Sequence, residues 1–132
     1  MQGAKPRLLL AEDHAELLSD VVCLLAEEFD VVGTAHDGIT LLERAAGLKP
    51  DVVVTDYKMP GLDGIEAGRR LLAAGHCKAV VLLTLHKDPS LVQAAVEAGI
   101  RGYVLKFDAV DDLVDAVHSA LERCAFPTPL RR

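Results

Sequence analysis

The sequence predicts an α/β fold in which a parallel sheet of five strands lies between two layers of helices. Short apolar runs begin near residues 8, 31, 52, 79 and 103, and one helical pattern follows each run. This alternation requires parallel strands joined by right-handed crossovers, with helices on both faces of the sheet. The chain has 132 residues, of which 51% are hydrophobic, and this suits one domain with its own core.

The first two strand-helix units are predicted from the start of the chain. The apolar run Leu8–Ala11 predicts a strand that ends before an acidic pair, and apolar residues at helical spacing follow it up to residue 25. A second strand is predicted over Val31–Ala35. Asp37 and Gly38 predict a turn into a helix, which we expect to close at Gly47 because glycine is common directly after a helix.

The central strand carries the feature on which the functional interpretation depends. Val52–Val54 are consecutive β-branched residues, as expected of a strand that is buried on both faces. The segment Met59–Gly61 and then Gly64 cannot continue this strand. Asp56 is therefore expected at the carboxyl end of a buried strand, which is the edge where open α/β sheets bind ligands.

The third and fourth helices follow the same rules. The third helix is expected to end at Gly75, and the apolar run over residues 79–83 predicts a strand that ends at Thr84. Asp88 and Pro89 have the residue types of an N-cap and of a first helical position. They predict the start of the fourth helix.

The end of the chain predicts a last strand-helix unit and a tail. A fifth strand is predicted over residues 102–105, and Asp108 is expected to cap the final helix. Apolar residues at intervals of three and four predict one buried stripe on this helix, made up of Val110, Leu113, Val114, Val117 and Leu121. Prolines follow at positions 127 and 129. We therefore expect one domain over residues 1–122 and a linker stub or tail over residues 123–132.

Charge and residue types argue against several classes of function. The chain has 14 Lys and Arg against 20 Asp and Glu, a net charge of −6, and no basic cluster larger than the Arg131-Arg132 pair. Direct binding of nucleic acid by this segment is therefore not expected. Cys23, Cys77 and Cys124 lack the spacing of a disulfide framework or a zinc site, and no apolar run approaches the ~20 residues of a membrane span. A cytoplasmic protein without a secretion signal is expected.

Chemically active side chains follow the strands at the points where the strands end. Because parallel strands point the same way, these side chains are expected at one edge of the sheet; they are Glu12, Asp13, Asp56, Thr84 and Lys106. Carboxylates brought this close repel one another unless a cation joins them, and oxygen ligands are those that Mg²⁺ prefers. An ammonium and a hydroxyl suit an anionic group. The set predicts Mg²⁺-dependent phosphoryl transfer with Asp56 as the nucleophile.

Each of these residues also has an ordinary structural explanation. Asp13 could be the N-cap of the first helix, and Asp56 could be a turn residue. Thr84 and Lys106 could be plain strand ends. Together these explanations require four independent accidents at the same edge of the sheet. The joint arrangement therefore favours the functional interpretation.

The same residues resemble the receiver domains of two-component response regulators, and in particular the subgroup that precedes LuxR/NarL-type helix-turn-helix domains. The resemblance rests on four segments that together span most of the chain: Glu12-Asp13, Asp56 with Met59–Gly64, Leu83-Thr84, and Ala98–Lys106. It implies a flavodoxin-like (βα)5 doubly wound parallel sheet, a three-layer sandwich with strand order 2-1-3-4-5.

The resemblance also implies a role for each acidic residue. Asp56 would be the phosphoacceptor, which takes a phosphoryl group from a phosphohistidine of a sensor histidine kinase. Asp13 and Asp56 would bind Mg²⁺ together with the backbone carbonyl of Lys58. Glu12 would act on the metal through a water molecule.

The remaining residues are implied to respond to the phosphoryl group. Lys106 would pair with its oxygens and Thr84 would bond one of them. Tyr103 matches the switch aromatic, whose ring is expected to move inward as Thr84 shifts. Such a protein would catalyse only its own phosphorylation and dephosphorylation, and it would control a LuxR/NarL-type DNA-binding domain C-terminal to this segment. The sequence leaves open whether the protein forms a homodimer.

Two departures from the family pattern and two alternative functions remain. Leu85 stands where the family commonly has a small residue and could narrow phosphoryl access, and Phe107 stands in place of a proline. A haloacid-dehalogenase-type phosphohydrolase would need a second Asp two residues after the nucleophile, where this chain has Lys58. The other alternative is a receiver-like module that binds partners without being phosphorylated.

Overall fold

The structure is a computed structural model that describes residues 5–85 and 88–125. Strands and helices alternate along the chain as predicted. Their bounds are β1 Arg7–Ala11, α1 Ala15–Leu25, β2 Asp30–Ala35, α2 Gly38–Leu48, β3 Val52–Asp56, α3 Gly64–Ala74, β4 Ala79–Thr84, α4 Pro89–Glu97, β5 Gly102–Leu105, the 3-10 turn η1 Lys106–Asp108, and α5 Ala109–Ala125. The tail predicted from residue 123 thus begins within α5, and its prolines lie outside the described residues.

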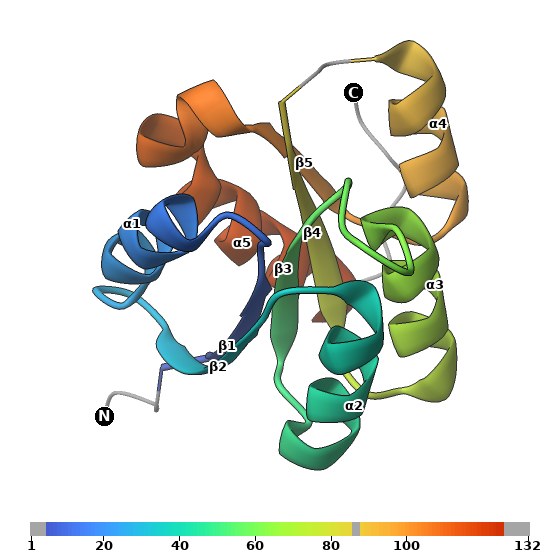
Figure 1. Cartoon of the computed structure of the whole chain (residues 1–132), viewed down its shortest axis with the longest axis horizontal. Helices are drawn as coiled ribbons and strands as arrows, with labels where there is room; N and C mark the ends of the chain where they lie inside the picture. Colours follow the sequence, from blue (N-terminus) through green and yellow to red (C-terminus); the bar gives the residue numbers. More distant parts are fainter. Residues whose placement is uncertain (1–4, 86–87, 126–132) are drawn as a thin grey trace.

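The five strands form one parallel sheet in the order β2-β1-β3-β4-β5. Helices α1 and α5 cover one face of this sheet, and α2, α3 and α4 cover the other (Figure 1). The arrangement confirms the predicted flavodoxin-like three-layer fold. Within the described ranges, none of the helices combines the length and the apolarity that crossing a membrane requires.

Side chains of the central strands point alternately into two hydrophobic layers. Leu8 and Leu10 pack on the side of α1 and α5, whereas Leu9 packs on the side of α2, α3 and α4. All three are fully buried. Because each buried side chain of this size contributes about 1.5–3 kcal/mol, the uninterrupted apolar runs of the central strands fix them between the two helix layers.

Helix α2 ends later than its sequence predicts. Gly47 lies inside the helix, which runs to Leu48 and is followed by Lys49 in the left-handed conformation with φ of 50°. The Arg7 guanidinium donates to the carbonyls of Leu48 (2.7 Å) and Lys49 (3.1 Å). These bonds satisfy carbonyls that a helix end leaves unpaired, so the helix does not stop at the glycine.

The apolar stripe predicted for α5 needs one correction. Val110 is 79% exposed, whereas Leu113 and Val117 are fully buried against the sheet. In the first turn of the helix the buried position is taken by Ala109, so the adjoining residue faces outward. The 3-10 turn η1, which includes Asp108, leads into this helix.

Candidate functional site

The carboxyl ends of four strands meet at one edge of the sheet. The strand register pairs Ala11 with Thr55. On the other side of β3, Asp56 lies opposite Leu83 of β4. Thr84, the last residue of β4, is paired with the last residue of β5. The residues that follow β1 and β5 therefore reach the same edge as Asp56, as the parallel arrangement predicts.

A buried ammonium lies between two buried carboxylates at this edge. Lys106 Nζ donates a hydrogen bond to Asp56 Oδ2 at 3.0 Å and forms an ion pair with Glu12 Oε1, also at 3.0 Å. Glu12 is fully buried and Asp56 is 4% exposed. Because buried charges are costly unless they are paired, this three-residue contact is specific to the folded chain and joins β1, β3 and the end of β5.

Asp13 and His14 form the exposed side of the same site. The backbone N–H of His14 donates to Glu12 Oε2 at 3.1 Å, and His14 Nδ1 lies 3.2 Å from that oxygen and 3.3 Å from Asp13 Oδ1. His14 occupies the N-cap position of α1, so the capping explanation for Asp13 is wrong. The sequence pattern did not predict the contacts of His14; its position directly after the acidic pair is the only signal for them.

Burial and charge shift the ionisation of the central pair. Burial raises the pKa of Asp56 to about 6; the negative charges of Glu12 and Asp13 add to this, and Lys106 opposes it. Burial by itself would lower the pKa of Lys106, but the carboxylates of Glu12 and Asp56 outweigh it and raise that pKa. Two carboxylates therefore share one ammonium, and with Asp13 beside them the site carries an excess of negative charge.

The donor set fits a hard divalent cation. Oxygen Oε1 of Glu12 is buried and accepts no hydrogen bond from any described residue, although it is ion-paired with Lys106. Ligand atoms of Glu12, Asp13 and His14 all lie within 4.8 Å of one another. Carboxylate oxygens with access to solvent are what Mg²⁺ prefers, because this ion keeps several of its waters. The residues present thus fit Mg²⁺, with Asp13 on the open side.

Thr84 and Tyr103 lie on the two strands beyond Asp56. Thr84 is 4% exposed, and the side chain of the next residue, Leu85, is 49% exposed. Tyr103 is half-buried against the hydrophobic layer of α2, α3 and α4. Burial raises the pKa of its hydroxyl, and hydrogen bonding with the backbone of Asp88 opposes this effect. Tyr103 is therefore close to the segment that follows β4.

The loop between β3 and α3 turns sharply after Asp56. The N–H of Gly64 donates to the carbonyl of Tyr57 at 2.8 Å, and the side chain of Asp63 caps α3 by accepting from Glu66 N–H at 2.8 Å. Lys58, whose carbonyl was predicted to face the metal, is exposed on this loop. One backbone bond and one side-chain cap thus hold the two ends of the loop that follows Asp56.

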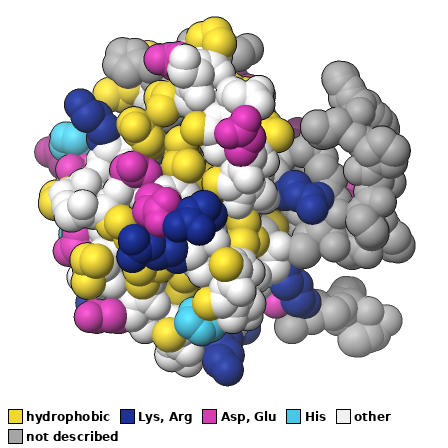
Figure 2. Space-filling view, turned by 90° about the vertical axis from the view of Figure 1, so that its right-hand side faces the viewer, with side chains coloured by type: hydrophobic (Ala, Val, Ile, Leu, Met, Phe, Trp, Pro, Cys, Tyr) yellow, Lys and Arg dark blue, Asp and Glu magenta, His cyan; other side chains and the backbone are white. Residues whose placement is uncertain are grey.

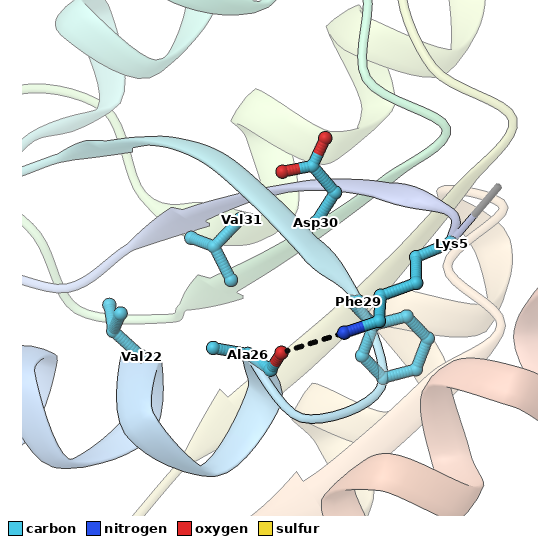
Figure 3. Close-up of a pocket in the computed structure, with 6 residues that line it drawn as sticks. All are labelled: Lys5, Val22, Ala26, Phe29, Asp30 and Val31. Carbon is cyan, nitrogen blue, oxygen red and sulfur yellow. Dashed lines mark hydrogen bonds between the residues drawn. The ribbon is translucent and has the colours of Figure 1, made fainter.

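Other surfaces differ in character from this site. On the side of α3 and α4, acidic and basic side chains lie next to one another among hydrophobic ones (Figure 2), as in the pairing of Glu66 with both Arg69 and Arg70. A groove of about 490 Å³ opens where α1 ends and β2 begins, lined by Lys5, Val22, Ala26, Phe29, Asp30 and Val31 (Figure 3). It contains none of the predicted site residues.

Comparison with known proteins gives consistent matches over most of the chain. The family described as response regulator receiver domain matches residues 8–118. The transcriptional regulatory protein PdtaR of Mycobacterium tuberculosis is 38% identical over 118 residues, which cover 89% of this chain and 57% of PdtaR. The chain thus spans little more than half the length of this curated relative.

Solved structures agree with the fold. The signal receiver domain of NarL from Mycobacterium tuberculosis superposes with a TM-score of 0.85 at 31% identity, covering 91% of this chain and 98% of that one. A LuxR-family two-component response regulator from Aurantimonas superposes with a TM-score of 0.83 at 30% identity, covering 90% of this chain and 86% of the other.

Proposed function

The chain belongs to the response regulator receiver domain family, and on this premise we propose that Asp56 is its phosphoacceptor in a Mg²⁺-dependent reaction. The observation that carries the proposal is the buried contact of Lys106 with both Glu12 and Asp56. This contact joins residues at the ends of three strands, and its charged groups do not belong to the hydrophobic layers that stabilise the fold. Relatives of this chain are transcriptional regulators, and the haloacid-dehalogenase alternative is not supported.

The proposed reaction moves a phosphoryl group from a phosphohistidine to Asp56. A carboxylate oxygen of Asp56 forms the new P–O bond as the P–N bond of the donor breaks, and the departing imidazole nitrogen takes up a proton. The raised pKa of Asp56, about 6, still leaves the carboxylate ionised at neutral pH and so competent to attack.

Lys106 and Thr84 are proposed to receive the new negative charge. Before transfer the ammonium of Lys106 lies 3.0 Å from Asp56 Oδ2, so it already lies beside the carboxylate that forms the bond. A phosphoryl group on Asp56 adds oxygens to which the ammonium can shift, since they carry more charge than one carboxylate. Thr84, buried at the end of the neighbouring strand, supplies a hydroxyl donor to the same group.

We propose that Asp13, Asp56 and the backbone carbonyl of Lys58 would hold Mg²⁺, with Glu12 acting through water. When bound, the ion neutralises charge that develops on the phosphoryl oxygens. Glu12 contributes in a second way, because its buried carboxylate anchors Lys106 before the phosphoryl group arrives. Asp13 lies on the exposed side of the site, which both Mg²⁺ and the phosphohistidine of the kinase can reach from solvent.

The output is proposed to depend on Thr84 and Tyr103. Their strands are hydrogen-bonded neighbours, so a shift of Thr84 toward the phosphoryl group changes the packing beside Tyr103. The inward movement of the Tyr103 ring would then remodel the surface of the last two strands and their helices. The protein catalyses, on this view, only its own phosphorylation and dephosphorylation.

The partners are proposed from the family. A sensor histidine kinase supplies the phosphoryl group, and a LuxR/NarL-type DNA-binding domain C-terminal to this segment responds to it. Homodimerisation is proposed as a link between phosphorylation of the receiver domain and the response of the DNA-binding domain. A cytoplasmic location is supported by the cysteine pattern, since Cys23, Cys77 and Cys124 lack the spacing of a disulfide framework.

The experiment that tests the proposal is incubation with acetyl phosphate and Mg²⁺, followed by intact-mass measurement. One acid-labile phosphoryl adduct is expected on the wild-type chain and none on Asp56→Asn. Absence of an adduct on the wild type would favour the module that binds partners without phosphorylation. An adduct retained by Asp56→Asn would show that another residue is the nucleophile. Lys106→Ala should weaken the response to phosphorylation more than it weakens Mg²⁺ binding.

A further inference from the structure

A short turn between β2 and α2 contacts both segments that carry the proposed metal ligands. On one side, the carbonyl of Ala35 accepts a hydrogen bond from the N–H of Glu12 at 3.0 Å. On the other side, the N–H of Gly38 lies 3.4 Å from the carbonyl of Pro60 in the loop after Asp56. Four consecutive residues, 35–38, therefore lie between the acidic pair and the loop of Lys58.

The contact at Gly38 leaves no room for a side chain. A Cβ atom placed on Gly38 would lie 2.3 Å from the carbonyl oxygen of Leu62 and 2.6 Å from its Cβ. The nearest obstacle is backbone, which cannot rotate away as the end of a flexible side chain would. Glycine is therefore required here for the first turn of α2 to approach the loop closely.

The turn itself is held firmly. The Asp37 carboxylate accepts from the N–H of Thr40 at 2.7 Å and from its hydroxyl at 3.2 Å, so it caps α2 with two bonds. Hydrogen bonding to Thr40 lowers the pKa of Asp37, so this cap is ionised at neutral pH. Next to it, the Cγ1 atom of Ile39 would lie 3.8 Å from a Cβ placed on Gly61, so this side chain lies close to the loop. A displacement of the loop therefore has to displace a capped helix end.

We propose that Gly38 is a positioning residue: the turn over residues 35–38 sets the separation of the Glu12-Asp13 pair from the loop of Lys58, and so sets the affinity for Mg²⁺. This inference rests on the proposed function. The turn supplies no ligand of its own. It acts through two backbone contacts, each made to one of the two segments that close around the cation.

The experiment compares Gly38→Ala with Gly47→Ala, a glycine-to-alanine change in the same helix. A Cβ on Gly47 meets nothing within 4 Å, so this variant controls for helix propensity. The dissociation constant of Mg²⁺ is measured by isothermal titration on folded protein, beside the rate of phosphorylation by acetyl phosphate at low and saturating Mg²⁺. Gly38→Ala should weaken Mg²⁺ binding at least about tenfold, because small displacements of binding groups are costly. At saturating Mg²⁺ its rate should recover toward that of the wild type.

The outcomes separate this inference from the proposed function. If wild-type protein neither binds Mg²⁺ nor accepts a phosphoryl group, the proposed function fails. If the wild type does both and Gly38→Ala keeps the wild-type dissociation constant, only the positioning role is overturned, even where the variant is less stable. Should Gly38→Ala not fold, Ile39→Ala tests the positioning role instead. Ile39 is 49% exposed, so its truncation is expected to leave the domain folded. A weaker Mg²⁺ affinity with an unchanged urea midpoint supports the role, and an unchanged affinity overturns it.

Discussion

Replacing Asp56 with Asn should stabilise the metal-free domain at neutral pH. The Asp56 carboxylate is buried, close to Glu12 and Asp13, and only Lys106 offsets its charge. Asn has nearly the same shape as the protonated carboxyl group and carries no charge. The variant therefore removes the free-energy cost of an ionised Asp56 while it leaves the surrounding packing in place.

The size of this effect follows from the pKa of Asp56, which burial raises from 3.8 to about 6. A carboxyl group with a raised pKa in the folded state opposes folding when it ionises. The cost is absent below about pH 4 and complete above about pH 6, so wild-type stability falls through this window relative to the variant. Each pKa unit corresponds to about 1.4 kcal/mol, so the difference at pH 7.5 approaches about 3 kcal/mol.

Urea unfolding followed by circular dichroism, with EDTA present, measures the free energy of unfolding of both proteins between pH 4 and pH 8. We expect equal stabilities at the acid end and a gap that opens as the pH rises. Added Mg²⁺ should close much of the gap, because a cation that binds the folded state stabilises the wild type through its ligands. Asp20→Asn, at an exposed position of α1, is the control and should change stability by less than about 0.5 kcal/mol.

Two results would refute the reasoning. A stability difference that is constant between pH 4 and pH 8 would show that ionisation of Asp56 is not its cause. A variant that is less stable than the wild type at pH 7.5 would show that the contact with Lys106 outweighs the cost of burying the carboxylate.

Three further predictions concern single side chains. Gly64→Ala should lower the free energy of unfolding by about 1–3 kcal/mol in urea, because its Cβ would lie 2.1 Å from the Asp56 carbonyl oxygen; unchanged stability would contradict the close approach. Val110→Ser should change that free energy by less than about 0.5 kcal/mol, whereas Val117→Ala, at a fully buried position, should cost over about 1 kcal/mol; equal effects would mean that α5 is oriented differently. Leu85→Ala should speed phosphorylation by acetyl phosphate at least about threefold if this half-exposed side chain narrows access, and an unchanged rate would dismiss that role.

The sequence predicts most of the fold because the buried strands consist of uninterrupted apolar residues, which are recognisable from the sequence alone. The fifth strand, predicted over residues 102–105, has the bounds of β5. The cap at Asp88 with Pro89 in the first turn was likewise predicted and confirmed, because both signals act within a few residues. Gly75 ends α3 in the left-handed conformation for the same local reason.

The errors arise where distant residues decide the outcome. Gly47 does not end α2, because Arg7, some forty residues earlier in the chain, binds the carbonyls that follow it. At the site, the rule for parallel strands predicts that Glu12, Asp56 and Lys106 share an edge. It does not predict that one ammonium contacts both carboxylates, since that depends on how the 3-10 turn after β5 directs the lysine side chain.

The strand order divides the candidate site between two parts of the sheet that differ in their freedom to move. The acidic residues lie at the carboxyl ends of β1 and β3, each of which is paired on both sides within the sheet. Tyr103 and Lys106 belong instead to β5 and its end, and β5 has a partner strand on one side only. Fewer interstrand bonds resist a displacement at a sheet margin than at its centre. The five-stranded sheet can therefore hold the cation-binding carboxylates rigidly at its centre while its outer strand moves, without a hinge between domains.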